Sequence, residues 1–213
     1  MAVMTVLPLS DVFDLLPIAS VVWDRDDNTE TSGMGSGAFW EADLAPSLWT
    51  GDVSFDRDRT TSLKQVAALV RWLRATKQRF MMCDPVSLYP AEDPGGAILG
   101  NAEVTLRAIT NRFVAPLQGL PVGYVLTPGD KLQVPYADKH AFVEVAQRAV
   151  ADAAGRADIA ISPHLPLPIV DGAAVNLKRP AFVAAVAPKS HNPGTARRHL
   201  TEGAGFKVIE KRN

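Results

Sequence analysis

The chain has very little cysteine and no long apolar run. Cys83 is the only cysteine among 213 residues, so neither an internal disulfide nor a cysteine-based metal cluster can form. A lone cysteine in an apolar run is typical of a core residue rather than of a nucleophile. No apolar stretch approaches the roughly 20 residues that span a bilayer, and residues 1–9 lack the pattern of a secretory leader. We therefore expect a protein that is made in a cytoplasm and stays soluble there, with no membrane partner.

An excess of charge of either sign is also missing. The chain has 22 Lys and Arg residues against 23 Asp and Glu residues, which gives a formal net charge of −1. This balance argues against the basic footprint of a nucleic-acid-binding protein. The hydrophobic share of 47% is enough to bury a sizeable core, as one globular unit or as two closely joined small ones.

Patterns that would indicate a metal, a phosphate or a nucleophile are absent as well. The four histidines do not have the short spacing of metal ligands, and no serine has the flanking residues of a catalytic elbow. The glycine-rich residues 33–37 lead into an expected strand rather than a helix, so they are interpreted as a flexible turn and not as a phosphate loop. His191 and His199 lie in a basic tail that we interpret as a solvated surface. We expect no enzyme activity, no metal and no cofactor.

Two residue groups leave alternatives open. Asp84, Glu92 and Asp93 could serve as the paired carboxylates of a hydrolase, but they lie among prolines, where such residues usually bond turn amides. The tryptophans could form a sugar-stacking platform of a carbohydrate-binding module, although their scatter along the chain suits core packing better. These residues are Trp23, Trp40, Trp49 and Trp72.

The spacing of apolar residues predicts one helix, at about residues 62–76. Leu63, Val66 and Val70 recur at three- and four-residue intervals, and charged residues occupy the other side. Thr61 or Ser62 can accept a hydrogen bond as its N-cap. The apolar stripe needs a sheet or a neighbouring subunit to cover it.

Almost all of the remaining sequence has the pattern of strands and turns. Residues 38–44 and 49–55 each alternate with period two, and Ala45-Pro46-Ser47 could form a hairpin turn between them. The 16 prolines and 15 glycines lie mostly between predicted strands, as in the turn of residues 127–130. The residues from Asp24 to Gly37 are polar and glycine-rich, which predicts a mobile loop or arm. The fold class we expect is mainly β (α+β), a β-sandwich or barrel with one flanking helix.

Several turn-rich segments follow one another in a distinctive order. They are Leu44-Ala-Pro-Ser-Leu-Trp-Thr-Gly51, Phe80-Met-Met-Cys-Asp-Pro85 with Tyr89-Pro90 and Asp93-Pro94-Gly95, Leu120-Pro-Val-Gly-Tyr-Val-Leu-Thr-Pro-Gly-Asp130, His140 to Val150, Ala151 to Gly155, and Ile161 to Leu165. In this order they resemble tail proteins of long-tailed bacteriophages, in particular distal or minor tail proteins of phages of proteobacteria. The similarity extends over residues 44–188, and its motifs are structural turns.

The resemblance implies a structural virion protein: a ring, usually a hexamer, that joins the tail tube to the baseplate hub. It implies a fold related to the tail-tube subunit, with the tail tube protein and the hub protein as partners and DNA only as passing cargo. Localisation would be at the phage tail tip, after assembly in the host cytoplasm. The length leaves little room for the extra carbohydrate-binding domain of many such proteins.

The polar arm and the helix stripe are the surfaces that we expect to contact neighbouring copies. The predicted interface residues are Asp24, Asn28, Gly33, Gly35, Leu63, Val66, Val70 and Asp130. We expect either a single ring subunit over residues 1–213 or two lobes, residues 1–115 and 116–213, because apolar strand patterns restart near Pro116.

Overall fold

The computed structural model describes residues 5–33, 35, 37 and 39–212. The chain forms two compact units. Unit 1 consists of residues 1–80 and 184–211, and unit 2 consists of residues 81–183 with the last two residues. The units do not divide at the expected position, because residues 115 and 116 both lie in one strand, β8, within unit 2.

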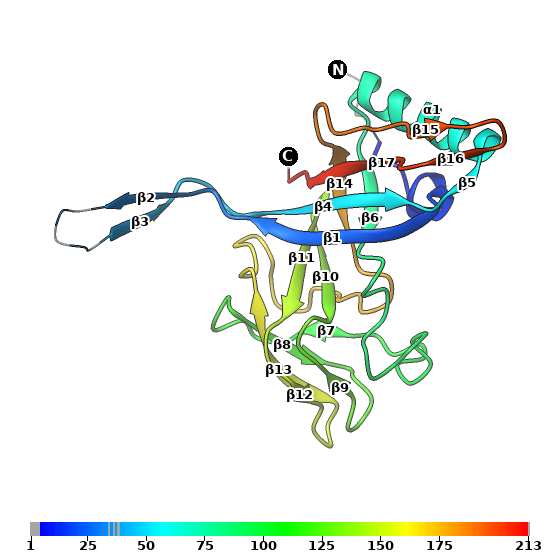
Figure 1. Ribbon diagram of the computed structural model, residues 1–213. Coiled ribbons are helices and arrows are strands. Elements are labelled where there is room, and N and C mark those ends of the chain that lie inside the picture. Colours follow the sequence, from blue (N-terminus) through cyan, green and yellow to red (C-terminus); the bar gives the residue numbers. More distant parts are fainter. Residues whose placement is uncertain (1–4, 34, 36, 38, 213) are drawn as a thin grey trace. The chain divides into compact units, whose positions relative to one another are not determined.

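A five-stranded sheet with the order β1-β4-β17-β14-β6 is the main element of unit 1 (Figure 1). A smaller sheet has the order β15-β16-β5, and the helix α1 and two short 3-10 helices complete the unit. The chain passes between the two units in β6 and β14. The bounds in this part are η1 Leu9–Asp11, η2 Phe13–Leu15, β1 Ile18–Asp26, β2 Thr29–Gly33, β3 Phe39–Asp43, β4 Leu48–Phe55, β5 Asp58–Arg59, α1 Thr60–Thr76, β6 Phe80–Cys83, β14 Ala181–Val186, β15 Thr195–Ala196, β16 Leu200–Glu202 and β17 Gly205–Glu210.

The helix α1 forms where the sequence predicts it and starts two residues earlier. Its N-cap is therefore Arg59 and not the expected Thr61 or Ser62, and the Arg59 side chain makes no capping hydrogen bond. Its apolar side chains are buried, and it ends at Lys77, which adopts the left-handed conformation of a helix C-cap. The amides of Lys77 and Gln78 bond carbonyls of the last turn. Within unit 1 the core also contains Val53 and Val208, and the rings of Phe55 and Phe206 pack with centroids 5.7 Å apart.

Unit 2 is built on a second five-stranded sheet, with the order β10-β11-β13-β8-β7, and a two-stranded sheet of β9 and β12. Its core holds Leu106, Leu117, Leu132 and Ile159, none of which is exposed to solvent. The strand bounds are β7 Thr105–Leu106, β8 Val114–Gln118, β9 Val125–Leu126, β10 Lys131–Tyr136, β11 Lys139–Val145, β12 Ala149–Val150 and β13 Arg156–Ser162.

The expected fold class, mainly β (α+β), is therefore confirmed. None of the sheets that the described residues form closes into a barrel, so the barrel alternative is wrong. The relation to the tail-tube fold stays a prediction.

Candidate interaction surface

An extended two-stranded ribbon leaves the main sheet of unit 1. β1 pairs with β4, and β2 pairs with β3, so these four strands form the two sides of one long hairpin. β17 supplies a third strand to β4 only as far as Thr50, which pairs with Ile209. Beyond this point the carboxylate of Glu210 accepts a hydrogen bond of 3.1 Å from the amide of Trp49, and the ribbon continues with two strands. We call residues 24–47 the arm (Figure 1).

The arm shows that two sequence-based expectations need correction. The segment Asp24 to Gly37, expected as a mobile loop or arm, is not a loop, because it contains the end of β1 and all of β2. The strands expected at residues 38–44 and 49–55 do not form a hairpin with each other, because β3 pairs with β2 and β4 pairs with β1. The physical reason is that β3 and β4 both belong to the returning side of the long hairpin and follow one another in the same direction, so each pairs with a strand of the outgoing side. Ala38 lies outside the described residues.

Large apolar side chains are exposed on both faces of the arm. Phe39 and Trp40 are 70% and 67% exposed, and Leu44 is also exposed. Because successive residues of a strand point to opposite faces, Phe39 and Trp40 lie on different faces of the ribbon. A two-stranded hairpin is marginally stable in water when nothing packs on it. The arm therefore has the composition of an element that another surface covers.

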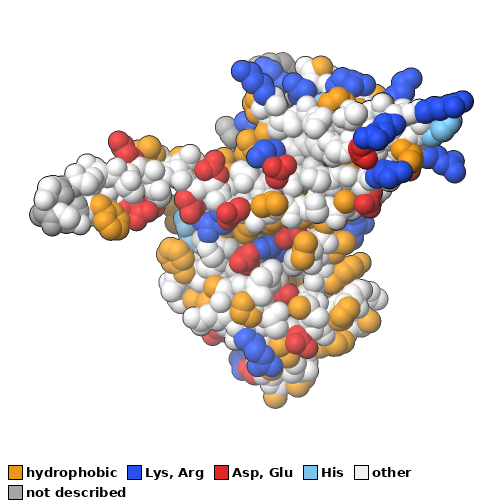
Figure 2. All heavy atoms as spheres, in the orientation of Figure 1, with side chains coloured by type: hydrophobic (Ala, Val, Ile, Leu, Met, Phe, Trp, Pro, Cys, Tyr) orange, Lys and Arg blue, Asp and Glu red, His pale blue; other side chains and the backbone are white. Residues whose placement is uncertain are grey.

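The arm is also strongly acidic. It contains six Asp and Glu residues and a single basic residue, Arg25. Arg25 makes an ion pair of 3.6 Å with Asp27 and bonds the hydroxyl of Ser47. Glu30, Glu41 and Asp43 are all exposed. Figure 2 shows acidic and hydrophobic side chains along this ribbon. The acidic residues are Asp24, Asp26, Asp27, Glu30, Glu41 and Asp43.

The base of the arm is fixed by close packing of an indole ring on a glycine. Trp23 lies opposite Gly51 in the pairing of β1 with β4. A Cβ atom placed on Gly51 would lie 2.1 Å from the Trp23 ring and 3.0 Å from the Val208 side chain. Only glycine leaves room for the ring here, directly before β1 passes into the arm.

Four of the predicted interface residues lie in the arm. Asp24 ends the part of β1 that has three-stranded support, and its carboxylate accepts a hydrogen bond from the amide of Arg25. The carbonyl of Asn28 accepts a bond of 2.8 Å from Leu44. Gly33 ends β2, and neither Gly33 nor Gly35 would meet an atom within 4 Å if it carried a side chain.

The other four predicted interface residues are buried. Leu63, Val66 and Val70 are at most 9% exposed, because the helix stripe is covered within the folded chain, so no neighbouring copy is needed to cover it. Asp130 is 3% exposed and belongs to a turn in unit 2. Its carboxylate accepts hydrogen bonds from the amides of Ala91 and Thr127, at 2.9 and 2.7 Å. These side chains stabilise their own chain.

A basic face lies at the end of the main sheet opposite to the arm. β4 runs from Leu48 next to the arm to Phe55, and β5 follows with Arg57 just before it. β5 pairs with β16, and the turn between β15 and β16 carries Arg197, Arg198 and His199. We call the exposed residues Arg57, Arg59, Lys64, Arg71, Arg74, Arg197, Arg198 and His199 the basic face. Lys and Arg side chains gather over α1 and β16 in Figure 2.

Hydrogen bonds join the parts of this basic face. The amide of Thr60, at the start of α1, donates to the carbonyl of His199 at 3.1 Å, and the Thr60 hydroxyl donates to the carbonyl of Arg197. Further along α1, the charges of Arg71 and Arg74 influence the pKa of His191. Burial, together with these two arginines, holds the pKa of His191 below its usual range. The positive potential therefore extends from the β15–β16 turn along the helix.

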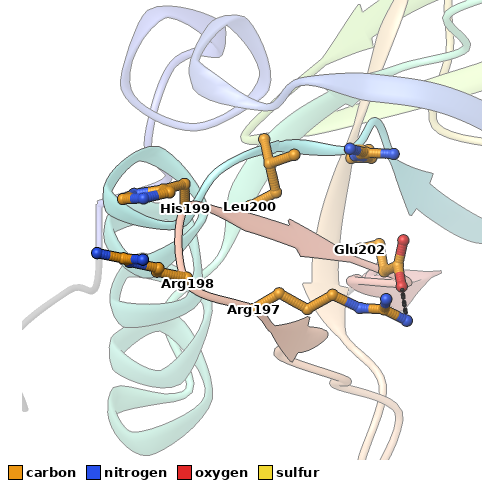
Figure 3. Close-up of a pocket in the computed structure, with 6 residues that line it drawn as sticks. Arg197, Arg198, His199, Leu200 and Glu202 are labelled. Atoms are coloured by element: carbon orange, nitrogen blue, oxygen red, sulfur yellow. Dashed lines mark ion pairs between the residues drawn. The ribbon is translucent and has the colours of Figure 1, made fainter.

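A pocket of about 240 Å³ opens within the basic face (Figure 3). Its walls are mostly apolar even though five of its six lining residues can carry charge. Arg197 and Glu202 make an ion pair of 2.9 Å on one side, while Arg198 and His199 extend towards α1. The lining residues are Arg57, Arg197, Arg198, His199, Leu200 and Glu202. The volume is below the roughly 300–1,000 Å³ of small-molecule sites, so the pocket suits one inserted side chain better than a substrate.

The candidate carboxylates of unit 2 are engaged in turns. Asp93 is 1% exposed and accepts hydrogen bonds from the amides of Ile98 and Leu99, at 2.8 and 2.9 Å, and from the Tyr124 hydroxyl. Burial alone would raise the pKa of Asp93, but these three donors, with Lys178 nearby, hold it below its usual value. Glu92 beside it is exposed.

Asp84 belongs to a separate buried cluster. It accepts a bond of 2.9 Å from the amide of Val86, and its carboxylate lies 4.0 Å from the ammonium of Lys131. Lys131 also pairs with Glu144 on the neighbouring strand. Burial raises the pKa of Asp84, although the Val86 amide and Lys131 oppose this shift. The arrangement is that of internal ion pairs.

The remaining candidates do not converge on one site. Trp23 and Trp49 lie on one face of the main sheet, but Trp49 is buried, and Trp72 is on α1 and Trp40 on the arm. The four tryptophans therefore do not form one exposed platform. Cys83 is buried. Within the described part of the chain, no three His, Cys, Asp or Glu residues are placed to hold a metal ion. Over the same residues, no helix has the length and apolar character to cross a membrane.

The basic face is the surface that the sequence reasoning missed. Arg197, Arg198 and His199 were interpreted as part of a solvated tail, and the charges on the helix as its ordinary outer side. The available signal was the segregation of charge: residues 48–80 and 184–211 hold twelve Lys and Arg against five Asp and Glu, whereas the arm has the opposite excess. A whole-chain net charge of −1 conceals this separation.

Comparison with known protein families and with curated proteins finds no match for this chain. The functional argument therefore depends on the two surfaces of unit 1, the acidic arm and the basic face.

Proposed function

We propose that this protein is a structural subunit of a bacteriophage tail, a distal tail protein whose copies form a ring between the tail tube and the baseplate hub. The motifs from residue 44 to residue 188 resemble that group of proteins. The protein acts by assembly and not by catalysis. A hexamer is the copy number that the resemblance implies.

The observation that carries this proposal is the arm. A ribbon that leaves a folded sheet, exposes Phe39 and Trp40 on opposite faces and has no third strand is poorly suited to an isolated monomer. In a closed cyclic assembly, each arm can be covered by a neighbour, so every copy gains the same contact. The mainly β fold with one flanking helix also agrees with the expected subunit.

The buried acids of unit 2 support an architectural role for that unit. Asp93 bonds the amides of Ile98 and Leu99 further along its own loop, and Asp130 joins the turn of residues 127–130 to Ala91 of that loop. Long loops that are held in this way provide fixed surfaces for the tube and hub proteins without a mobile active-site segment.

The mass of the purified protein in solution tests the proposal, measured by light scattering together with negative-stain images of the same sample. A monomer has a mass of 22.9 kDa, and a ring of six has about 137 kDa. We expect ring-shaped particles with six-fold symmetry, whose proportion rises with protein concentration. A protein that remains monomeric at high concentration, with or without the tail tube protein, would contradict the proposal.

A further inference from the structure

The geometry points to a specific contact between copies: the acidic arm of one copy docks on the basic face of the next, and an aromatic residue of the arm enters the pocket beside Leu200. This inference rests on the proposed ring, and it names the surfaces that build the ring. Both surfaces belong to unit 1.

The first argument is topological. The arm and the basic face lie at opposite ends of β4, separated by roughly 20 Å for a strand of this length. The arm extends a further 30 Å or so away from the sheet. An arm that points away from its own basic face can cover only the face of another copy. When each copy passes its arm to the next in one direction, the contact is heterologous, and repeated heterologous contacts produce closed rings or open filaments.

The second argument is charge complementarity. Six acidic residues and one arginine give the arm a formal charge of −5, whereas the sheet and helix segments 48–80 and 184–211 have a formal charge of +7. Opposite potentials on two surfaces accelerate their encounter and fix the register of docking. Two arms, or two basic faces, would repel each other, so the charges favour contact between an arm and a basic face. A symmetric dimer that exchanges its two arms satisfies the same charges, and the disulfide test below distinguishes that dimer from a head-to-tail ring.

The third argument is the match of apolar groups. The arm presents exposed Phe39, Trp40 and Leu44, and the basic face presents a pocket with mostly apolar walls. Trp and Arg are enriched among the residues that contribute most to protein interfaces. An indole that enters the pocket would also lie near Arg57 and Arg198, and arginine is the cation that most often packs on aromatic faces.

Charge-reversal variants test the contact. Glu30→Lys/Glu41→Lys reverses two exposed charges on the arm, and Arg57→Glu/Arg198→Glu reverses two on the basic face. Each pair alone should weaken self-association at least tenfold, as measured by sedimentation velocity over a range of concentrations. The four substitutions combined in one chain restore opposite signs at every contact and should recover most of the association.

The matched controls, Glu92→Lys/Glu103→Lys and Lys139→Glu/Arg148→Glu, change exposed charges of unit 2 by the same amount and should leave association unchanged.

Disulfide trapping supplies an independent readout. Glu41→Cys/Arg198→Cys places one thiol on the arm and one on the basic face, while the native Cys83 is buried. Under mild oxidation this variant should give a ladder of covalent dimers, trimers and larger species on a non-reducing gel. Each single-cysteine variant can give at most a dimer, and it should give little of that.

The outcomes separate this contact from the proposed function. Loss of association in each reversal pair, recovery in the combined variant and a disulfide ladder support the docking. If the unmodified protein forms rings that neither reversal pair weakens, the docking is overturned and the ring function stands. If the unmodified protein is monomeric and the cysteine variant gives no ladder, both are overturned.

Discussion

Acidic residues have opposite roles in the arm and in the loops of unit 2. In unit 2, Asp93 and Asp130 are buried, and backbone amides and hydroxyl groups surround their oxygens. In the arm, Glu30, Glu41 and Asp43 are exposed on a ribbon with little internal support. The comparison teaches that a carboxylate which already bonds its own backbone fixes a loop, whereas one exposed on a projecting element is available to a partner.

The largest effect on stability is expected from replacing a buried carboxylate of unit 2. Asp93→Ala removes the acceptor for two amides and the Tyr124 hydroxyl, and it leaves the Leu99 amide and the Tyr124 hydroxyl buried without a partner. We expect a loss of about 3 kcal/mol or more in the free energy of unfolding, measured by urea denaturation. The neighbouring substitution Glu92→Ala, at an exposed position, should change the stability by less than about 0.5 kcal/mol. Equal effects of the two substitutions would contradict the assigned role of Asp93.

The next effect is at the base of the arm. Gly51→Ala places a methyl group within 2.1 Å of the Trp23 ring, so the ring must move away from the strand. We expect a loss of roughly 1–3 kcal/mol, the usual cost of overpacking, and a change in the near-UV circular dichroism of tryptophan. Gly33→Ala is the matched control, because its Cβ would meet no atom within 4 Å. A Gly51→Ala protein as stable as this control would show that the ring does not depend on the glycine.

A smaller effect concerns the stability of the protein at acid pH, through His191. Burial and the nearby Arg71 and Arg74 hold the pKa of His191 below 6.5, so the unfolded chain binds a proton in a range where the folded chain does not. Stability should therefore fall as the pH decreases through about 6.5. His191→Gln should reduce this fall, as measured by thermal unfolding between pH 7.5 and 5.5. His140, whose pKa burial also lowers, is unchanged in the variant and sets the residual dependence. An identical pH dependence in both proteins would refute the role of His191.

The sequence predicts the local features of the fold but not the contacts between distant segments. The helix and the turn of residues 127–130 were predicted, because their signals are local: a 3.6-residue apolar period, and a Pro-Gly pair with Asp130. The pairing of β3 with β2 could not be predicted, since alternation marks a strand without naming its partner. The sequence identifies Leu63, Val66 and Val70 as an apolar stripe and predicts them as contacts with a neighbouring copy. That the same chain buries them could not be predicted, because it requires the tertiary fold.

The smallest expected effect on stability is in the arm itself. Phe39→Ser/Trp40→Ser replaces two side chains that are mostly exposed, so little buried area is lost in the monomer. We expect the free energy of unfolding of the monomer to change by no more than about 0.5 kcal/mol per site. A large loss, measured by urea denaturation at low protein concentration, would mean that these rings pack within their own chain.

If the arm exists for assembly, light scattering should give different masses for the unmodified protein and for Phe39→Ser/Trp40→Ser at the same concentrations. We expect a mass near 137 kDa for the unmodified protein, six times its 22.9 kDa, and a mass near that of the monomer for the variant. Equal masses for the two proteins, whether monomeric or assembled, would contradict this role of the arm.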